Sequence, residues 1–265
     1  MTRRLKRRVL KQETCLLFWI DLTFLIPATA QSAASALIKD TWDDGVYVYT
    51  SPLRLEESDL PMGLTVAGLL GGSLALDRIT RRNLLTYQNS GSANTLQSYG
   101  NYAQFAGPML GGIFAASGWA THDAYQKQVS WDLIESFLWA NAVSETFKLS
   151  LGRRRPYATD DPFELRPGST SGSFPSGHTT SAFAAATTLS EYYPTWKVMV
   201  PAYAAASVVG FSRIYANQHW GSDVVGGALV GYSVSHTLFK RHRKRTESSW
   251  DFRVSPDGLA VSRRF

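Results

Sequence analysis

The sequence contains a single cysteine, Cys15, and this scarcity excludes whole classes of site. One thiol can form neither a disulfide framework nor a cysteine-ligated metal centre within the chain. The sequence also has no evident carboxylate-rich stretch that would form a metal cage. A catalytic site must therefore use the five histidines, hydroxyl and carboxylate groups, and permanent cations.

The chain is basic, but its charge is not arranged as on a nucleic-acid surface. Its 265 residues carry a net charge of +6. Much of this charge lies between Arg3 and Lys11 and between Lys240 and Arg245. Neither run is interleaved with aromatic residues, as nucleic-acid surfaces commonly are. We therefore expect a targeting segment, a solvated or lipid-facing helix end, and no nucleic-acid partner.

Residues 1–30 have the pattern of a secretory signal peptide. A basic start precedes an apolar stretch that is short for a membrane span, and Ala28-Thr29-Ala30 forms an A-x-A cleavage site. Asp21 interrupts the apolar stretch, which leaves an uncleaved membrane anchor as the alternative. We predict cleavage before Gln31 and export of the protein.

The middle of the sequence is rich in alanine and glycine and has helical periodicity. We predict an all-α fold, an up-down bundle of about six helices, as a catalytic region at residues 60–245. Residues 31–59 would be an N-terminal extension and residues 246–265 a C-terminal tail. The helices are expected at residues 60–77, 102–119, 130–150, 178–192, 196–213 and 221–240.

Small β pieces are expected towards both ends of the chain. Val46-Tyr47-Val48-Tyr49 has the composition of a short strand. Residues 252–254 and 259–261 read as two strands joined by the turn Ser255-Pro256-Asp257-Gly258. Pairing of all these pieces into a small flap is a further expectation.

The stretch Ser173-Phe174-Pro175-Ser176-Gly177-His178 is the centre of the predicted site. Pro175 suits the start of the helix that follows, because it has no N–H to leave unsatisfied. Ser176 and Gly177 would then offer free backbone N–H groups at the positive end of a helix dipole. Such a helix start favours an anion, and a phosphate-sized anion fits it best.

Two further clusters lie at ends of predicted helices. Lys148 and Arg155 are seven residues apart, so both can project from one helix face, and Pro156 would end that helix. His219 and Asp223 are one helical turn apart, so the carboxylate can fix the ring tautomer and leave the other nitrogen free to attack.

Other histidines and arginines lack such neighbours in the sequence. We expect His122, His236 and His242 to be structural or surface residues, and Arg153 and Arg154 to face solvent. Each cluster alone has a simple structural explanation, such as a helix end or a hydrogen-bonded histidine. Only their combination, in order and at helix ends, indicates a catalytic site.

Together the clusters resemble the complete signature of the type 2 phosphatidic acid phosphatase superfamily, which also includes bacterial acid phosphatases and vanadium haloperoxidases. The resemblance covers residues 148–223, and the flanking helices agree with the bundle of that family. The three parts read Lys148-x6-Arg155-Pro156, then Pro175-Ser176-Gly177-His178, then Ser212-Arg213-x5-His219-x3-Asp223.

The resemblance implies a role for three residues in proton and phosphoryl transfer. His219 would be the nucleophile and form a phosphohistidine, while Asp223 would hold its ring and stabilise its charge. His178 would protonate the leaving alkoxide and then activate water.

The resemblance also implies how the phosphate is held. Lys148, Arg155 and Arg213 would clamp its oxygens, and Ser176 and Gly177 would add a hydroxyl and a backbone N–H. Three cations do the work of Mg²⁺ elsewhere, so we expect no metal and no other cofactor.

An up-down bundle would place all these residues at one end. The basic residues 240–245 would lie at the other end and, in a spanning bundle, face the cytoplasm, which directs the site to the periplasm. A cleaved signal followed by three crossings would contradict this placement. Mean hydropathy is −0.15, and Asp132, Glu135 and Glu145 would be costly in lipid. We therefore favour an exported, soluble or membrane-associated bundle, and an integral one is the alternative.

The favoured function is a metal-independent phosphatase of phosphate monoesters, with a phosphorylated lipid preferred over a small ester as substrate. A soluble non-specific acid phosphatase and a vanadate-dependent haloperoxidase, in which His219 would ligate vanadate, are the enzymatic alternatives. A non-catalytic phosphate-binding or lipid-binding bundle is a third class. The histidine pair argues against it, because binding alone requires cations but no nucleophile.

Overall fold

The computed structural model describes residues 28–85, 91–248, 250–255 and 258–263, and the chain divides into two compact units, residues 1–47 and 48–265. Helix α2, Ala28–Tyr49, provides the described part of the first unit. The predicted strand at Val46–Tyr49 is wrong, because the helix continues through these four residues. Most of the predicted signal segment lies outside the described residues, and its last three residues begin α2.

The second unit is built almost entirely of helices. The prediction of a mainly α-helical fold is confirmed, but eight α-helices, rather than about six, occur among the described residues, since α2 and α4 were not predicted. The helices after α2 are the short 3₁₀ turns Ser51–Arg54 and Glu57–Asp59, then α3 Leu60–Leu85, α4 Gly91–Ala103, α5 Ala106–Ala120, α6 Ala124–Leu151, α7 Gly177–Tyr192, α8 Trp196–Tyr215 and α9 Gly221–Ser248.

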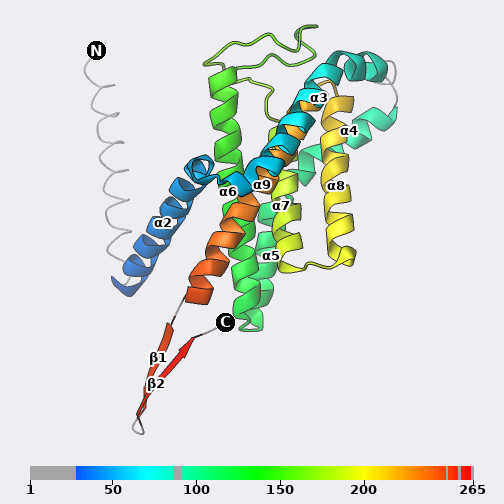
Figure 1. Ribbon diagram of the computed structural model, residues 1–265. Helices are drawn as coiled ribbons and strands as arrows, with labels where there is room; N and C mark the ends of the chain where they lie inside the picture. The colour runs from blue at the N-terminus through cyan, green and yellow to red at the C-terminus, as the bar shows by residue number, and fades with distance from the viewer. Residues whose placement is uncertain (1–27, 86–90, 249, 256–257, 264–265) are drawn as a thin grey trace, which may run out of the picture. The chain divides into compact units, whose positions relative to one another are not determined.

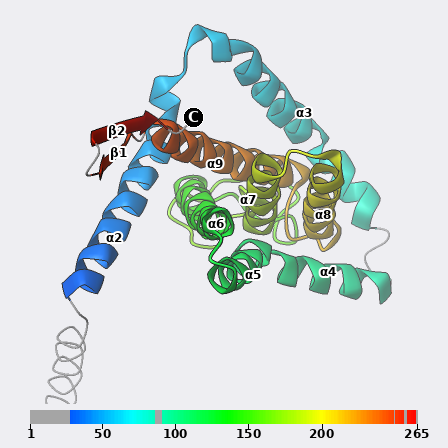
Figure 2. The ribbon, with the colours of Figure 1, turned by 90° about the horizontal axis from the view of Figure 1, so that it is seen from below.

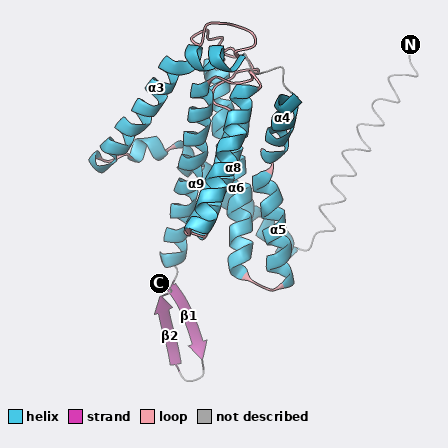
Figure 3. Ribbon diagram, turned by 90° about the vertical axis from the view of Figure 1, so that its right-hand side faces the viewer, coloured by secondary structure: helices cyan, strands magenta, loops and turns pink. Residues whose placement is uncertain are grey.

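Helix α7 lies at the centre of the bundle and contacts α6, α8 and α9. Seen along the bundle, α5 lies beside α6, α4 beside α8, and α3 on the side of α9 (Figures 1 and 2). Because the chain runs up and down, α6 and α8 end where α7 and α9 begin. The long loop between α6 and α7 gathers at this end (Figure 3).

Small residues let the central helices approach closely. The faces of α7 bury Ala182, Ala184 and Ala185, which have little volume to separate the helices. A Cβ at Gly231 of α9 would lie 2.4 Å from the carbonyl oxygen of Thr180 on α7. Any larger residue at Gly231 would therefore force α9 away from α7.

Local signals define both ends of α6. Asp123 caps its N-terminus, since its Oδ1 accepts hydrogen bonds from the backbone N–H groups of Tyr125 and Gln126. Gly152 ends it in a left-handed conformation with φ 55°, and a Cβ there would lie 1.7 Å from the carbonyl oxygen of Arg166. The helix therefore ends at Gly152, whereas the sequence predicted an end at Pro156.

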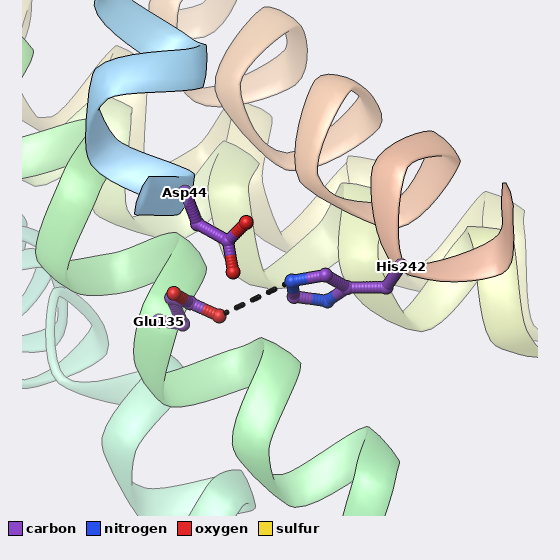
Figure 4. Close-up of side chains that lie close together, drawn as sticks. All are labelled: Asp44, Glu135 and His242. Atoms are coloured by element: carbon purple, nitrogen blue, oxygen red, sulfur yellow. Dashed lines mark ion pairs between the residues drawn. The ribbon is translucent and has the colours of Figure 1, made fainter. Parts of the chain in front are cut away.

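His236 and His242 each contact a carboxylate of another helix, which agrees with the structural role expected for them. His236 Nδ1 lies 2.5 Å from Glu191 Oε1, and His242 Nδ1 lies 2.9 Å from Asp132 Oδ1. Figure 4 shows His242 on α9 facing Glu135 on α6, with His242 Nε2 3.5 Å from Glu135 Oε2. Asp132 and Glu135 of α6 are therefore buried beside His242, whereas Glu145 of the same helix is exposed.

An antiparallel hairpin follows α9. Strand β1, Trp250–Ser255, pairs with β2, Gly258–Arg263, at the place where the sequence indicates strand, turn and strand (Figure 3). Residues 46–49 do not join it, because they are helical. The predicted flap built from both ends of the chain is therefore wrong.

Two described segments are long and apolar enough to cross a membrane, Glu57–Leu84 and Trp196–Tyr215. Their apolar side chains are largely uncovered within the structure: Leu64 of α3 is 74% exposed and Val200 of α8 is 62% exposed. Contiguous apolar surface of this extent is typical of a face that meets lipid or another protein.

Candidate functional site

The three sequence clusters come together at the end of the bundle where α6 and α8 end and α7 and α9 begin. The loop 152–176 closes this end. Backbone hydrogen bonds hold the loop to the helices, since Ser173 N–H donates to Arg153 O and Gly168 N–H donates to Leu149 O. Residues far apart in sequence thus share one site.

His219 is buried, and a neighbour at each of its two ring nitrogens fixes the orientation of the ring. Nδ1 lies 2.8 Å from the carbonyl oxygen of Ser173, so it carries the proton and donates it. Nε2 lies 3.3 Å from Nη1 of Arg155. In this tautomer the Nε2 lone pair faces the positive charge of the guanidinium.

Asp223 supports His219 less directly than the sequence indicates. Its Oδ2 lies 3.6 Å from His219 Nδ1 and 2.8 Å from the backbone nitrogen of Trp220, which donates to it. Helix α9 begins at Gly221, so His219 precedes it and the one-turn spacing does not apply. The carbonyl of Ser173 fixes the tautomer, and the Asp223 carboxylate adds negative charge nearby.

Arg155 reaches the site from the loop and not from a helix face. Its Nη1 donates to the carbonyl oxygen of Gln218 at 3.2 Å, and its Nε donates to that of Ser171 at 3.3 Å. Since α6 ends at Leu151, helical spacing cannot bring Arg155 and Lys148 together. The turn after Gly152 positions Arg155 instead.

Lys148 lies beside the start of α7. Its Nζ donates to Glu145 Oε1 at 2.5 Å. It would lie 3.0 Å from a Cβ at Gly177, so the absence of a side chain at that glycine leaves room for the ammonium group. This contact places Lys148 next to the predicted anion site.

Ser176 occupies the N-cap position of α7, and Pro175 precedes the cap. The N–H of Ser176 donates to the carbonyl oxygen of Asp223 at 2.9 Å, so the expectation that this N–H is free is wrong. Its Oγ accepts a hydrogen bond from Thr179 Oγ1 at 3.0 Å. Ser176 therefore ties the start of α7 to the start of α9.

His178 lies in the first turn of α7 among several positive charges. Burial lowers its pKa to about 3, and the charges of Arg213, His219, Lys148 and Arg155 act in the same direction. The pKa of His219 is also lowered, mainly by burial, although Asp223 opposes this effect. The two imidazoles and three cations are thus close enough to influence one another.

Arg213 is held by a helix that the sequence did not predict. Its Nη1 donates to Asn101 Oδ1 at 2.7 Å and its Nη2 to the carbonyl oxygen of Gln97 at 2.8 Å, both on α4. A Cβ at Gly100 would lie 2.4 Å from Arg213 Nη2. Helix α4 therefore fixes the direction of this guanidinium.

The lowered histidine pKa values predict that the protein loses stability in mild acid. Between about pH 6.5, the usual histidine pKa, and the lowered values, the unfolded chain binds protons that the folded chain does not. We expect the melting temperature to fall from pH 7 to pH 5. In His178→Asn the fall should be smaller by about 2–4 °C, as measured by thermal unfolding. An equal fall in both proteins would contradict this.

A buried charge network lies behind His219, and it corrects the expectation that Arg153 faces solvent. Arg153 is 4% exposed, and its guanidinium donates to Asp223 Oδ1 at 2.6 Å and to Asp77 Oδ2 at 2.7 Å. It also lies over the ring of Trp220, 5.6 Å from the centroid. Sequence reasoning missed Asp77, although a lone carboxylate in an apolar helix is a recognised signal of function.

A small cavity opens beside Arg155 in the loop after α6. Its volume is about 170 Å³. Four arginines line the cavity, and one carboxylate, Glu164, contacts two of them, Arg154 at 3.1 Å and Arg166 at 3.0 Å. The lining therefore carries more positive than negative charge. Its lining consists of Gly152, Arg153, Arg154, Arg155, Tyr157, Ala158, Arg166, Ser169 and Ser171.

The structure thus brings two histidines and several cations to one end of a helical bundle. Residues 130–247 match the sequence profile of the PAP2 superfamily. This match confirms the resemblance seen in the three clusters, all of which lie within the matched residues.

Two curated relatives share parts of the sequence. The chain is 43% identical over 103 residues to a lipid A 1-phosphatase of Porphyromonas gingivalis, covering 35% of this chain and 21% of that protein. It is 32% identical over 110 residues to an undecaprenyl-diphosphatase of Sulfolobus acidocaldarius, covering 41% of this chain and 53% of that protein. The matches therefore span about a fifth and about half of these relatives.

A solved structure shares the fold. The crystal structure of a transmembrane PAP2 type phosphatidylglycerolphosphate phosphatase from Bacillus subtilis aligns with a TM-score of 0.55. The alignment covers 73% of this chain and all of that one, at 18% identity. The shared fold therefore covers more of the chain than the residues 130–247 that match the sequence profile.

Proposed function

We propose that the protein is a metal-independent phosphatase of phosphorylated lipids that acts through a phosphohistidine. The observation that carries the proposal is the orientation of His219. Its Nδ1 donates to a backbone carbonyl, and its Nε2 lies 3.3 Å from the Arg155 guanidinium. In this tautomer Nε2 accepts from the Arg155 guanidinium, so a phosphate bound by that cation would lie beside the Nε2 lone pair, which is then placed to attack phosphorus.

In the first step, His219 Nε2 attacks the phosphorus atom and the bond to the leaving oxygen breaks. Lys148, Arg155 and Arg213 hold the remaining phosphate oxygens and stabilise their charge as the bonds change. His178 donates its proton to the leaving alkoxide. The free enzyme keeps His178 neutral, with a pKa of about 3, and the charge of a bound phosphate raises that pKa so that the ring can be protonated.

In the second step, the neutral His178 takes a proton from water while the water oxygen attacks phosphorus. The P–N bond to His219 breaks, inorganic phosphate leaves, and the Nε2 lone pair is restored. Asp223 stabilises the positive charge that the His219 ring carries while it is phosphorylated, because its carboxylate lies 3.6 Å from Nδ1. No metal ion enters either step.

The protein is proposed to associate with a membrane through its apolar helices, with the site on the extracytoplasmic side. The exposed apolar faces of α3 and α8 support membrane contact. Helix α9 carries Asp223 near its first residue and the basic residues 240–245 near its last, so the site and this basic cluster lie at opposite ends. Basic residues favour the cytoplasmic side, which supports the opposite placement for the site.

A phosphorylated lipid is the proposed substrate class. The names of the curated relatives, a lipid A 1-phosphatase and an undecaprenyl-diphosphatase, support it. The basic cavity beside Arg155 would hold polar groups of the lipid that are not transferred, while α3 and α8 offer apolar surface for the chains.

A phosphate-release assay tests the proposal. Purified protein in EDTA should release phosphate from at least one phosphorylated lipid at a higher kcat/KM than from small soluble monoesters, and the protein should be recovered with the membrane fraction. Equal or better turnover of soluble monoesters would contradict the lipid assignment. Release of phosphate from no ester at all would contradict the phosphatase.

A further inference from the structure

Behind His219 and Asp223 lie the buried side chains of Asp77 and Arg153, which the proposed steps do not use. We infer that Asp77 and Arg153 are positioning residues for His219, which act through Asp223 and through the first turn of α9. The inference rests on the proposed function insofar as His219 is the attacking group. It makes α3, an apolar helix remote in sequence, a necessary part of the catalytic site.

Arg153 connects the two carboxylates through separate nitrogens of one rigid fork. Nη1 donates to Asp223 Oδ1 at 2.6 Å and to Ser222 Oγ at 2.7 Å, whereas Nη2 donates to Asp77 Oδ2 at 2.7 Å. Nε donates to the carbonyl oxygen of Pro162 at 2.7 Å. A planar group fixed at all three nitrogens holds Asp223 in one orientation, with its Oδ2 3.6 Å from His219 Nδ1.

Asp77 supports the start of α9 from a different helix. Its Oδ1 accepts a hydrogen bond from the backbone N–H of Ser222 at 2.9 Å, and its Oδ2 accepts one from Ser222 Oγ at 2.5 Å. Ser222 is the second residue of α9, so its N–H has no acceptor within the helix. Asp77 therefore caps α9 and fixes the turn on which Asp223 and His219 depend.

The charges of this network do not balance, and the imbalance has a consequence for His219. Asp77 and Asp223 are 1% and 0% exposed and share the single positive charge of Arg153. A buried ion pair kept only for stability would need one carboxylate, because a second adds a desolvation cost. The surplus negative charge stabilises a positive ring at His219, which both imidazolium and phosphohistidine forms would carry.

The substitution Asp77→Asn removes the surplus negative charge of the network while keeping the shape of the side chain. The amide oxygen can still accept the Ser222 N–H, so the α9 cap remains. We expect the pKa of His219 to fall by about one unit, measured by NMR titration of the histidine ring protons. If the proposed function holds, kcat should fall roughly tenfold or more with KM within about twofold.

The titration must take account of the other charged groups that face His219. Burial lowers its pKa and the charge of Arg155 adds to this effect, whereas Asp223 and the hydrogen bond to the Ser173 carbonyl raise it. Asp77→Asn changes none of these four. The matched control is Asp161→Asn, which removes a different contact of α3, the exposed ion pair with Arg78 at 3.2 Å. Asp161→Asn should leave both the His219 pKa and kcat unchanged.

Each outcome decides the inference. A His219 pKa that is the same in Asp77→Asn and wild type would overturn it, even if kcat falls, because Asp77 would then only hold α3 in place. If Asp77→Asn does not fold, Ser222→Ala decides, since it removes the hydroxyl between Asp77 and Arg153 and keeps every charge. A several-fold lower kcat at unchanged KM would support the inference, and a wild-type kcat would overturn it.

The proposed function and this inference can fail separately. If wild-type protein hydrolyses no phosphate ester, the proposed phosphatase is wrong, while the NMR titration of His219 still tests the network. If wild-type protein hydrolyses lipid phosphates and the titrations coincide, only the role of Asp77 and Arg153 is wrong.

Discussion

His219→Ala is expected to abolish phosphate release, by a factor on the order of 10⁴ or more, in buffer containing EDTA. The substitution removes Nε2, the atom that faces Arg155 at 3.3 Å and is proposed to attack phosphorus. The cations that bind the substrate remain, so the affinity for inorganic phosphate should change much less than kcat. Phosphate release from the preferred lipid, with and without EDTA, provides the measurement.

A covalent intermediate gives this prediction a second readout. Wild-type protein quenched in alkali during turnover of ³²P-labelled substrate should retain label that is stable to base and released by acid, as a phosphohistidine is. His219→Ala should retain none. His236→Ala, which disrupts the remote contact with Glu191 at 2.5 Å, is the control and should keep near-wild-type turnover and label. A His219→Ala enzyme that retains the wild-type rate would refute the nucleophile.

The central helices could be predicted from sequence because their signals are local. Helix α7, expected at residues 178–192, runs from Gly177 to Tyr192, and α8 was expected at residues 196–213 and runs to Tyr215. Periodicity, small polar residues at helix starts and breakers between helices are all properties of short stretches. The three clusters could be found for the same reason, since each lies within a dozen residues.

The routes by which site residues meet could not be predicted, because they depend on distant contacts. Arg155 was placed on a helix face, yet α6 ends at Gly152, where the carbonyl of Arg166 leaves no room for a Cβ. The tautomer of His219 was attributed to Asp223, yet the carbonyl of Ser173 lies closer, at 2.8 Å. Only the folded loop brings these groups together.

The support for the site comes from helices whose sequences carry weak signals. Helix α4 was not predicted, and yet it holds Arg213 through Asn101 and Gln97. Helix α3 was predicted to end at Asp77, the residue that it contributes to the network, and in fact continues to Leu85. Predicting such support requires knowledge of which helices pack together, and hydrophobic periodicity does not supply it.

His178→Ala is expected to lower kcat by about 10²–10⁴-fold for an alkyl phosphate, the range typical of a lost general acid and base. An alkoxide leaves poorly without a proton, and the proposed source of that proton is His178. The His178 ring has a depressed pKa of about 3 and is neutral in the free enzyme, so its removal leaves the positive charge of the site unchanged. Phosphate binding should therefore be preserved. Steady-state kinetics on the preferred lipid phosphate measure the change in kcat and KM.

The leaving group separates the two roles of His178. A nitrophenolate departs without a proton, so His178→Ala should still cleave nitrophenyl phosphate in the first step, and it should lack the base that activates water in the second. Rapid mixing should therefore show a burst of about one nitrophenolate per enzyme, then slow turnover, with phosphoenzyme accumulating on His219. His122→Asn, an exposed residue with φ 55° in the turn before α6, is the matched control and should behave as wild type. Equal losses on alkyl and nitrophenyl esters, with no burst, would show that His178 does not transfer the proton.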